Sequence, residues 1–327
     1  MRILGSSEVR QLLTMKDCIE VIDGALRTAS RRDLINPLRT GLRLPEGVPG
    51  ILGYMPGYLG DPQVFGAKLV SVFPGNHDLG LSSHQGVVII FETKTGQPIA
   101  ILDGSTVTGI RTAAASGVAT RALARGDATT LAVLGYGEQA REHIVAMAAV
   151  RRVNRVIVWG RSAERAQAFV RDWANLAPDA TFETAYRVEA AVAEADIICT
   201  TTAAREPILK GAWVRPGTHI NAVGASQPDV AEVDGDLITR SRYYVDFMPS
   251  TEAEAAPYRN ALRDGLIGED HVKGEVGAVL DGNAPGRQSA DDITVFQSLG
   301  FAAEDLATAV FVLNKARSEN VGVTVTF

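Results

Sequence analysis

Three cationic side chains stand in stretches of sequence that are otherwise apolar. Lys68 lies among valines in "VFGAKLVSVF", Arg111 lies in the small-residue segment "STVTGIRTAAAS", and Arg39 lies in "LRTGLRL" with Arg43 on the same side. An ion pair, or a side chain that reaches to the surface, would account for each cation singly. Together they predict a clamp for one small carboxylate, because Arg binds a carboxylate through two donors and Lys supplies a point charge.

A glycine-rich turn supplies a second piece of chemistry. The segment "LAVLGYGEQA" carries Gly135, Gly137 and Ala140 in the spacing G-x-G-x-x-A, after a strand-like run and before a helical one. The first glycine permits a tight turn, the second lets the backbone approach a pyrophosphate, and the small third residue lets helix and strand pack closely. The amino end of the helix then faces the phosphates. The segment predicts a dinucleotide site, and the alternative is a tight turn without a ligand.

The loop after the next strand indicates which dinucleotide is bound. Chains that bind NAD usually carry Asp or Glu about twenty residues after the glycines, where it accepts hydrogen bonds from ribose hydroxyls. Here "VIVWGRS" ends in Gly160, Arg161 and Ser162, and the last two can donate to a 2′-phosphate. Since a charge-assisted hydrogen bond contributes roughly 1.5–3 kcal/mol, we expect NADPH to be preferred, with NADH as the alternative. An arginine that is merely solvated in the loop is the other interpretation.

One strand-like run ends without any reactive side chain. The segment "HINAVGASQPDVAEVD" passes from an apolar run into Gly224, Ala225 and Ser226, and no ionisable residue follows before Asp229. Ligands of open α/β sheets bind outside the carboxyl ends of the strands. The end of this run therefore offers a ligand a small wall that carries one hydroxyl group, with no acid or base before Asp229.

The elements that must position these residues follow two patterns. The first hundred residues contain one helical stretch, 14–26, and then strand-like runs at 64–73, 86–92 and 98–104. From about residue 130 onward, strand-like and helical stretches alternate, which predicts a parallel sheet covered on both faces. The last segment begins as a strand at 293 and becomes a long amphipathic helix that is expected to pack on the first domain.

Composition restricts the class of partner. The chain has 327 residues, 46% hydrophobic and 21% charged, with a net charge of −6. Nucleic-acid and membrane partners are not expected, since phosphate binding needs clustered Lys and Arg. Cys18 and Cys199 stand in unrelated contexts and no His or Cys shows metal-ligand spacing, so neither a disulfide nor a metal is predicted. The amino-terminal segment lacks a continuous apolar core, and we expect a cytoplasmic protein.

Seven segments, taken in order, resemble the ornithine cyclodeaminase/mu-crystallin family across almost the whole chain. They are "PLRTGLRLP", "GAKLVSVFPGN", "HQGVVIIFE", "DGSTVTGIRTAAAS", "LGYGEQA", "INAVGAS" and "ITVFQSLGFAAEDLA". The resemblance implies an α/β protein with a Rossmann doubly wound parallel sheet, residues 113–301. A discontinuous α+β domain, residues 1–112 and 302–327, would bind the substrate and form a homodimer.

The resemblance also implies roles for individual residues. Arg39, Lys68 and Arg111 match the family's substrate-carboxylate clamp and are the catalytic candidates, with Met55 and Ser226 as further substrate-binding positions. The positions expected to bind the cofactor are Arg111, Thr112, Gly135, Gly137, Glu138, Gln139, Gly160, Arg161, Ser162, Thr202, Val223, Ala225 and Ser298.

Two departures from the cyclodeaminase branch decide the expected reaction. That branch has an acid at the position of Ser226 and another near Gly53, and this chain has neither. The segment "AVGASQPD" is similar to the ketimine-reductase branch, which implies NAD(P)H-dependent reduction of a small, cyclic 2-imino acid such as 1-pyrroline-2-carboxylate or 1-piperideine-2-carboxylate to the L-amino acid. The alternatives are ornithine cyclodeamination, an alanine-dehydrogenase-like or opine-type reaction, and an NADPH-dependent ligand carrier without turnover.

Overall fold

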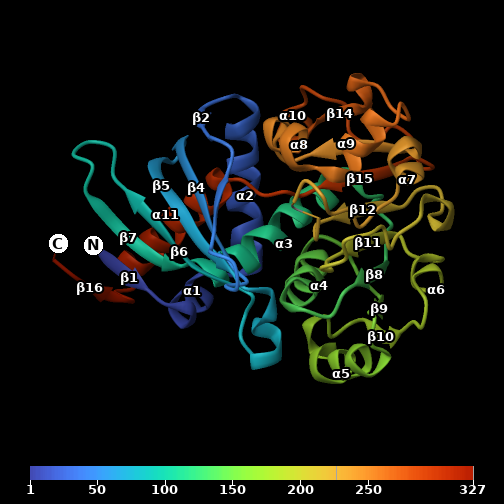
Figure 1. Cartoon of the computed structure of the whole chain (residues 1–327), viewed down its shortest axis with the longest axis horizontal. Coiled ribbons are helices and arrows are strands. Elements are labelled where there is room, and N and C mark those ends of the chain that lie inside the picture. Colours follow the sequence, from blue (N-terminus) through green and yellow to red (C-terminus); the bar gives the residue numbers. More distant parts are fainter. Residues whose placement is uncertain (226, 327) are drawn as a thin grey trace. The chain divides into compact units, whose positions relative to one another are not determined.

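The computed structural model describes residues 1–225 and 227–326 and divides into two compact units (Figure 1). The first unit comprises Met1–Arg111 and Gly300–Phe327, and the second comprises Thr112–Leu299. These bounds differ from the predicted domains 1–112, 302–327 and 113–301 by one residue at the first crossing and two at the second. The predicted fold class, a Rossmann sheet with a discontinuous α+β domain, is confirmed.

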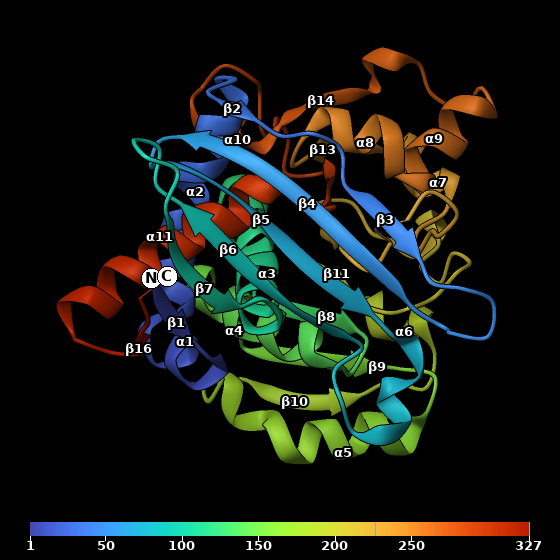
Figure 2. The ribbon, with the colours of Figure 1, turned by 60° about the vertical axis from the view of Figure 1, so that its left-hand side comes forward.

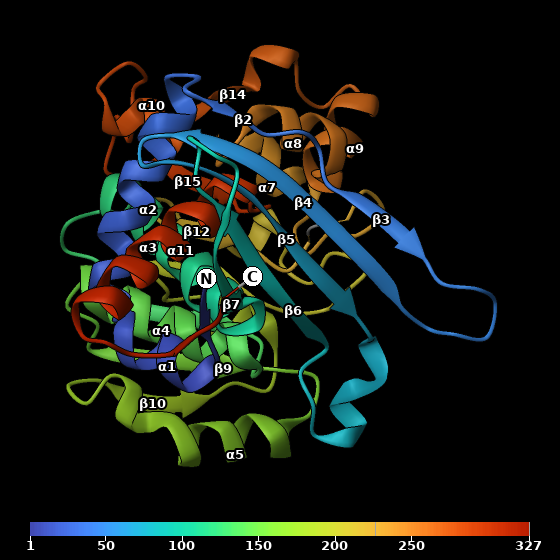
Figure 3. The same ribbon diagram turned by 90° about the vertical axis from the view of Figure 1, so that its left-hand side faces the viewer.

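The first unit is built on an eight-stranded, mostly antiparallel sheet. Its strands run in the order β16-β1-β7-β6-β5-β4-β2, with β3 paired to β4, and Figures 2 and 3 show β4 to β7 side by side. The strands are β1 (Arg2–Leu4), β2 (Leu34–Ile35), β3 (Thr40–Arg43), β4 (Ile51–Gly60), β5 (Gln63–Val72), β6 (His84–Phe91), β7 (Pro98–Asp103) and β16 (Val323–Thr324). The unit's own helical segments are α1 (Ser6–Leu12), α2 (Met15–Ser30), η1 (Pro74–Leu79) and α11 (Ala302–Ser318).

The register of this sheet separates a buried face from an exposed one. Met55 on β4 pairs with Lys68 on β5, which pairs with Val88 on β6, which pairs with Leu102 on β7, and all four are buried. Helix α11 packs against β4, β5 and β6. Because side chains alternate along a strand, the opposite face carries large apolar residues, and several of them are exposed.

The second unit is built on an eight-stranded sheet in which every pair is parallel. The strand order is β10-β9-β8-β11-β12-β15-β13-β14, so the chain reverses direction across the sheet between β8 and β11. This is the doubly wound order, in which a ligand binds at the carboxyl ends beside the reversal. The central strands β11, β12 and β15 are buried at every residue, as is usual in a parallel sheet covered on both faces.

Helices connect the strands of this sheet. Helix α3 (Gly104–Leu123) contains the boundary between the units at 111/112. The strands are β8 (Thr130–Leu134), β9 (Arg155–Trp159), β10 (Thr181–Thr184), β11 (Ile197–Thr200), β12 (His219–Ala222), β13 (Ser241–Val245), β14 (Val272–Glu275) and β15 (Ile293–Gln297). The other helical segments are α4 (Glu138–Val150), α5 (Ala163–Trp173), η2 (Ala174–Leu176), α6 (Val188–Val192), η3 (Gly211–Trp213), α7 (Gly235–Arg240), α8 (Met248–Glu254), α9 (Ala256–Arg263), η4 (Glu269–His271) and α10 (Val276–Leu280). Among the described residues, no helix combines the length and the apolar character that crossing a membrane requires.

Candidate functional site

Two of the three predicted clamp cations lie in one buried ionic cluster of the first unit. Lys68 Nζ is 2.9 Å from Asp305 Oδ2, and Arg111 donates from Nε to Asp305 Oδ1 at 2.9 Å and from Nη1 to Glu304 Oε2 at 2.7 Å. The side chains of Lys68 and Arg111 are 3% and 4% exposed, and both carboxylates are fully buried. The cations are therefore held by two acids in the first turn of α11, which the sequence reasoning missed.

Arg39 joins the cluster through the backbone at Gly300. Arg39 Nη2 donates to the carbonyl of Gly300 at 2.8 Å, and a Cβ on Gly300 would overlap the guanidinium of Arg111. Gly300 also has φ +72°, a backbone conformation that side chains other than glycine rarely adopt. The glycine of "SLGFAAED" thus lets both guanidinium groups approach the start of α11.

The gathering of cations at the start of α11 favours an anionic ligand. Lys68 and Arg111 contact the carboxylates of Glu304 and Asp305, and Arg39 contacts the carbonyl of Gly300 beside them. Guanidinium and ammonium groups form charge-assisted hydrogen bonds with carboxylates, so this cluster has the groups that a ligand carboxylate needs. The buried apolar Met55 lies next to Lys68 in the sheet register, on the same face.

The proton affinity of Lys68 is set by this environment. Burial, together with the charge of Arg111, lowers the pKa of Lys68 to about 8, while Asp305 acts in the opposite direction. Burial raises the pKa of Asp305, but Arg111 and Lys68 outweigh it and hold that pKa below its usual value. Lys68 is consequently a cation at neutral pH that can give up a proton near the operating pH, as general acids do.

The glycine-rich turn of the second unit has the geometry that a dinucleotide requires. Gly135 has φ +135°, and a Cβ there would lie 2.5 Å from Thr201 Oγ1. At Gly137 a Cβ would meet no described atom within 4 Å, so a pyrophosphate could approach the backbone. Gly137 is also the N-cap of α4 without a side-chain cap, so N–H groups at this helix end can meet phosphate oxygens. The turn therefore fits the predicted cofactor.

Two buried polar atoms at predicted cofactor positions lack a partner. Gln139 Oε1, in the first turn of α4, and Ser298 Oγ, directly after β15, form no hydrogen bond within the described part of the chain. Buried polar atoms are usually hydrogen-bonded, and each exception needs an explanation. A ligand that donates to Gln139 and contacts Ser298 would supply these partners.

The residues of the loop after β9, Gly160, Arg161 and Ser162, differ in the roles that the structure gives them. Ser162 caps α5, since its Oγ accepts from Arg165 N at 3.2 Å and donates to Glu164 Oε2 at 2.9 Å. Arg161 is exposed at the end of the strand. A Cβ on Gly160 would overlap the ring of Tyr136, whose side chain the sequence reasoning did not consider. Arg161 is thus the residue of this loop whose charge could select a 2′-phosphate.

The remaining predicted residues lie on α3 and α4 and after β11 and β12. The carboxylate of Glu232 is buried and accepts a hydrogen bond from the backbone N of Gly224 at 2.6 Å. The sequence reasoning missed this acid, which contacts the backbone of a segment, 224–225, that has no ionisable side chain of its own. Ser226 lies outside the described residues. The other predicted positions are Thr112 on α3, Glu138 at the start of α4, Thr202 after β11, and Val223 and Ala225 after β12.

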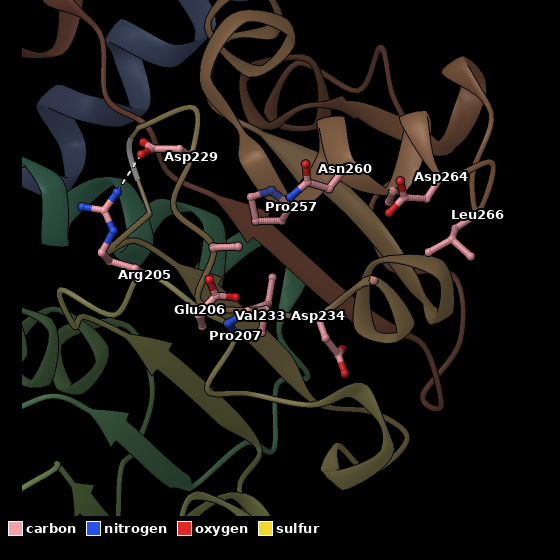
Figure 4. A pocket seen from close by; sticks show the side chains of 13 residues that line it. Arg205, Glu206, Pro207, Asp229, Val233, Asp234, Pro257, Asn260, Asp264 and Leu266 are labelled. Atoms are coloured by element: carbon pink, nitrogen blue, oxygen red, sulfur yellow. Dashed lines mark hydrogen bonds and ion pairs between the residues drawn. The ribbon is translucent and has the colours of Figure 1, made fainter.

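A pocket of about 320 Å³ lies elsewhere in the second unit (Figure 4). It is lined by residues of the segments 205–207, 229–235 and 257–266, and Arg205 and Asp229 form an ion pair of 2.7 Å at its side. None of the predicted site residues lines it. Its acids include Asp234, which caps α7, and we assign no function to this pocket.

Comparison with known proteins places the chain in a family. The family model for the ornithine cyclodeaminase/mu-crystallin family matches residues 2–320. The chain belongs to this family. A Delta(1)-pyrroline-2-carboxylate reductase of Bacillus cereus is 34% identical over 331 residues, covering 100% of both chains. The resemblance inferred from seven sequence segments is thereby confirmed.

Two solved structures are similar over nearly their whole length. The Delta(1)-pyrroline-2-carboxylate reductase of Thermococcus litoralis, in complex with NADH and L-proline, has a TM-score of 0.95 and 34% identity, covering 99% of this chain and 100% of that one. An archaeal alanine dehydrogenase dimer with bound NAD has a TM-score of 0.91 and 31% identity, covering 100% and 99%.

Proposed function

We propose that the protein is a nicotinamide-dependent oxidoreductase that reduces small 2-imino acids at the C–N bond. The substrates are cyclic imino acids such as 1-pyrroline-2-carboxylate and 1-piperideine-2-carboxylate, and the product is the L-amino acid, for example L-proline. The observation that carries this proposal is that Arg39 and the buried Lys68 and Arg111 come together at the start of α11, as a site for a small carboxylate requires. The names of the reductases similar to this chain support it.

Each cation has its own part in the proposed reaction. The guanidinium groups of Arg39 and Arg111 bind the substrate carboxylate and fix the orientation of the imine. Lys68, whose pKa is about 8, keeps a proton on the imine nitrogen and so keeps the imine carbon electrophilic. A bound nicotinamide cofactor supplies the hydride, so the protein has only to position and polarise the substrate.

The residues around the cationic cluster do not favour ornithine cyclodeamination. That reaction requires a base for the substrate amine and for water. Gly53 on β4 lies near the place where the cyclodeaminase branch has an acid. A Cβ at Gly53 would lie only 3.1 Å from Val70 Cγ1, so a larger side chain would be tightly packed there. The carboxylates of Glu304 and Asp305 are engaged with Arg111 and Lys68, so neither serves as this base.

Ammonia separates the competing reactions in one experiment. Oxidation of NADPH and NADH is followed with 1-pyrroline-2-carboxylate and 1-piperideine-2-carboxylate, then with pyruvate plus ammonia, and ornithine is tested for released ammonia. We expect oxidation with the cyclic imino acids in the absence of ammonia. Ammonia release from ornithine at a comparable rate would instead identify a cyclodeaminase, and binding of NADPH without oxidation by any imino acid would identify a ligand carrier.

The cofactor preferred under this proposal is NADPH. Arg161 supplies the cation for the 2′-phosphate, and Arg161→Asp is expected to lower the ratio of kcat/KM for NADPH over NADH by about 10- to 150-fold, the equivalent of roughly 1.5–3 kcal/mol. The control is Arg165→Asp, which makes the same charge change at an exposed position on α5. Equal ratios in the wild type and the Arg161 variant would show that this loop does not select the cofactor.

The rate of reduction should fall as the pH rises through about 8, because Lys68 then loses its proton. Asp305 raises the pKa of Lys68, so Asp305→Asn is expected to move this alkaline limb of the kcat/KM profile to lower pH. The profile of Asp17→Asn, in which another Lys–Asp pair of the same unit is broken, should keep the wild-type limb. A limb that stays in place in the Asp305 variant would exclude Lys68 as its source.

The partner proposed for the first unit is a second copy of the chain. Leu42, Leu52, Tyr54, Phe65 and Val87 are all exposed, by 36–63%, on the strands β3 to β6. Pairing of Leu42 with Leu52 and the alternation of side chains place them on the face opposite Lys68 and α11. Exposed apolar patches of this kind are typical of protein interfaces, and the similar alanine dehydrogenase is described as a dimer.

A charge placed on this face should separate the copies. We expect light scattering after size exclusion to give the mass of a homodimer for the wild type, and of a monomer for the double variant Leu52→Lys with Tyr54→Lys. The control, Tyr186→Lys, alters an aromatic residue of the second unit that is 80% exposed, and it should remain dimeric. A monomeric wild type would contradict the proposed interface.

A further inference from the structure

Glu232 is a buried acid that the proposed reaction does not use. Its side chain is 1% exposed, and it stands between β12 and α7. Its backbone carbonyl accepts from Ile208 N at 2.9 Å and from Leu209 N at 3.0 Å, which anchors the residue beside an isolated bridge between Leu209 and Val233. Burial removes the hydration of a carboxylate, and hydrogen bonds or charges of the protein must offset the resulting cost in free energy.

That compensation comes from the ends of two neighbouring strands. Oε1 accepts from the backbone N of Thr202 at 2.7 Å and from its Oγ1 at 2.6 Å, both just after β11. Oε2 accepts from Thr200 Oγ1 at 2.7 Å and from the backbone N of Gly224, just after β12, at 2.6 Å. A Cβ on Gly224 would overlap both Thr202 O and the carboxyl group, so the fit is close. The carboxylate ties the two strand ends together.

These strand ends belong to the half of the sheet that binds nicotinamide. In a doubly wound sheet each half binds one mononucleotide, and the cofactor lies outside the carboxyl ends of the strands. The strands β9 and β8 follow the order of the first half, with the glycine-rich turn after β8, whereas β11 and β12 open the second half. The predicted cofactor residues Thr202, Val223 and Ala225 lie in this stretch.

The hydrogen bonds around Glu232 favour its anionic form. The N–H groups of Thr202 and Gly224 can only donate, and Thr202 Oγ1 accepts from Ala204 N at 3.1 Å, which leaves its proton for Glu232. Burial raises the pKa of Glu232 above its ordinary value, and the hydrogen bonds from Thr202, Thr200 and Gly224 reduce that rise. Among the described residues, no Lys or Arg forms an ion pair with Glu232. Its charge, unlike that of Asp305, is therefore balanced by dipoles alone.

We propose that Glu232 is a positioning residue that favours the oxidised, positively charged form of the nicotinamide ring over the reduced, neutral form. The inference rests on the function proposed above. In hydride transfer, the C–H bond at C4 of the dihydronicotinamide breaks and a C–H bond forms at the imine carbon of the substrate. The two electrons of the hydride neutralise the iminium, and the positive charge moves to the ring. A fixed anion beside the ring stabilises that developing charge.

The test compares affinities for the two forms of the cofactor. Dissociation constants for NADP⁺ and NADPH are measured by titration for the wild type and for Glu232→Gln, which keeps the size of the side chain and removes its charge. The ratio of the constant for NADP⁺ to that for NADPH is expected to rise about tenfold in the variant, as expected for unit charges several ångströms apart at an intermediate dielectric. Asp229→Asn, which changes an exposed acid in the same segment, should leave the ratio unchanged.

A second measurement needs no variant and guards against misfolding of Glu232→Gln. In the wild type, the oxidised dinucleotide should bind about tenfold more tightly than its benzamide analogue, which has nearly the same shape but an uncharged ring. Equal affinities for the two would overturn the inference, as would two dissociation constants that rise by the same factor in Glu232→Gln. A wild type that binds no nicotinamide dinucleotide at all would instead overturn the proposed function and, with it, this inference.

Discussion

Lys68→Met is expected to lower kcat for imine reduction by about 10²- to 10⁴-fold, the usual contribution of a positioned general acid. The side chain is 3% exposed and its Nζ lies 2.9 Å from Asp305, so its position is fixed and water does not readily replace it. Methionine keeps the length and apolar volume of the lysine and removes only the charge and the proton. KM for the imino acid should rise less than kcat falls, because two guanidinium groups still bind the carboxylate.

The control for this variant is Lys315→Met, which removes a partly exposed lysine from its pair with Asp17 in the same unit. Its kcat should stay within about twofold of the wild type. Thermal unfolding must be measured alongside, since breaking a buried pair is destabilising by about 3–5 kcal/mol. A folded Lys68→Met enzyme with nearly unchanged kcat would assign the proton to water or to the substrate.

The second large effect is expected at Arg39. Arg39→Met should raise KM for 1-pyrroline-2-carboxylate by about 10- to 150-fold, which corresponds to the loss of one hydrogen bond to a charged group. Arg39 is held by the carbonyl of Gly300 at 2.8 Å, so its guanidinium is oriented before the substrate arrives. Arg39→Lys should recover only part of the affinity, because an ammonium cannot form the paired hydrogen bonds of a guanidinium.

Arg43 offers a matched control for Arg39. It lies on the same side of the segment, on β3, but it is exposed and pairs in register with Ile51. Arg43→Met is expected to leave KM within about twofold of the wild type, as exposed charges contribute little. Equal increases in KM for the two variants would mean that general attraction by positive charge, and not a clamp at Arg39, binds the carboxylate.

The features that could be predicted from the sequence are local ones. The turn at Gly135 and Gly137 is specified within six residues, and the alternation of strands and helices fixes a parallel sheet. Lys68 could be singled out because a cation among valines on one strand needs an anionic partner.

The partners of these residues could not be predicted, because they are distant in sequence. Asp305 and Lys68 form an ion pair although 237 positions separate them, 305 minus 68. The segment "FAAEDLA" does not indicate which cations its acids contact. Acids are common in the first turn of a helix because they interact favourably with the helix dipole. Glu232 could not be assigned to the site from the sequence, because it follows Gly224 by eight residues and contacts Gly224 N only in the folded chain. Ser162 was assigned to the cofactor, although it also serves as a helix cap.

The central claim is that hydride passes from the cofactor to the imine carbon of a small 2-imino acid. Incubation of the protein with NADPH that carries deuterium at both C4 positions and 1-pyrroline-2-carboxylate, in buffer without ammonia, tests it directly by mass spectrometry of the product. The expected product is L-proline with one deuterium at C2 for each NADPH oxidised. Proline without deuterium, or unchanged NADPH and imino acid, would contradict it.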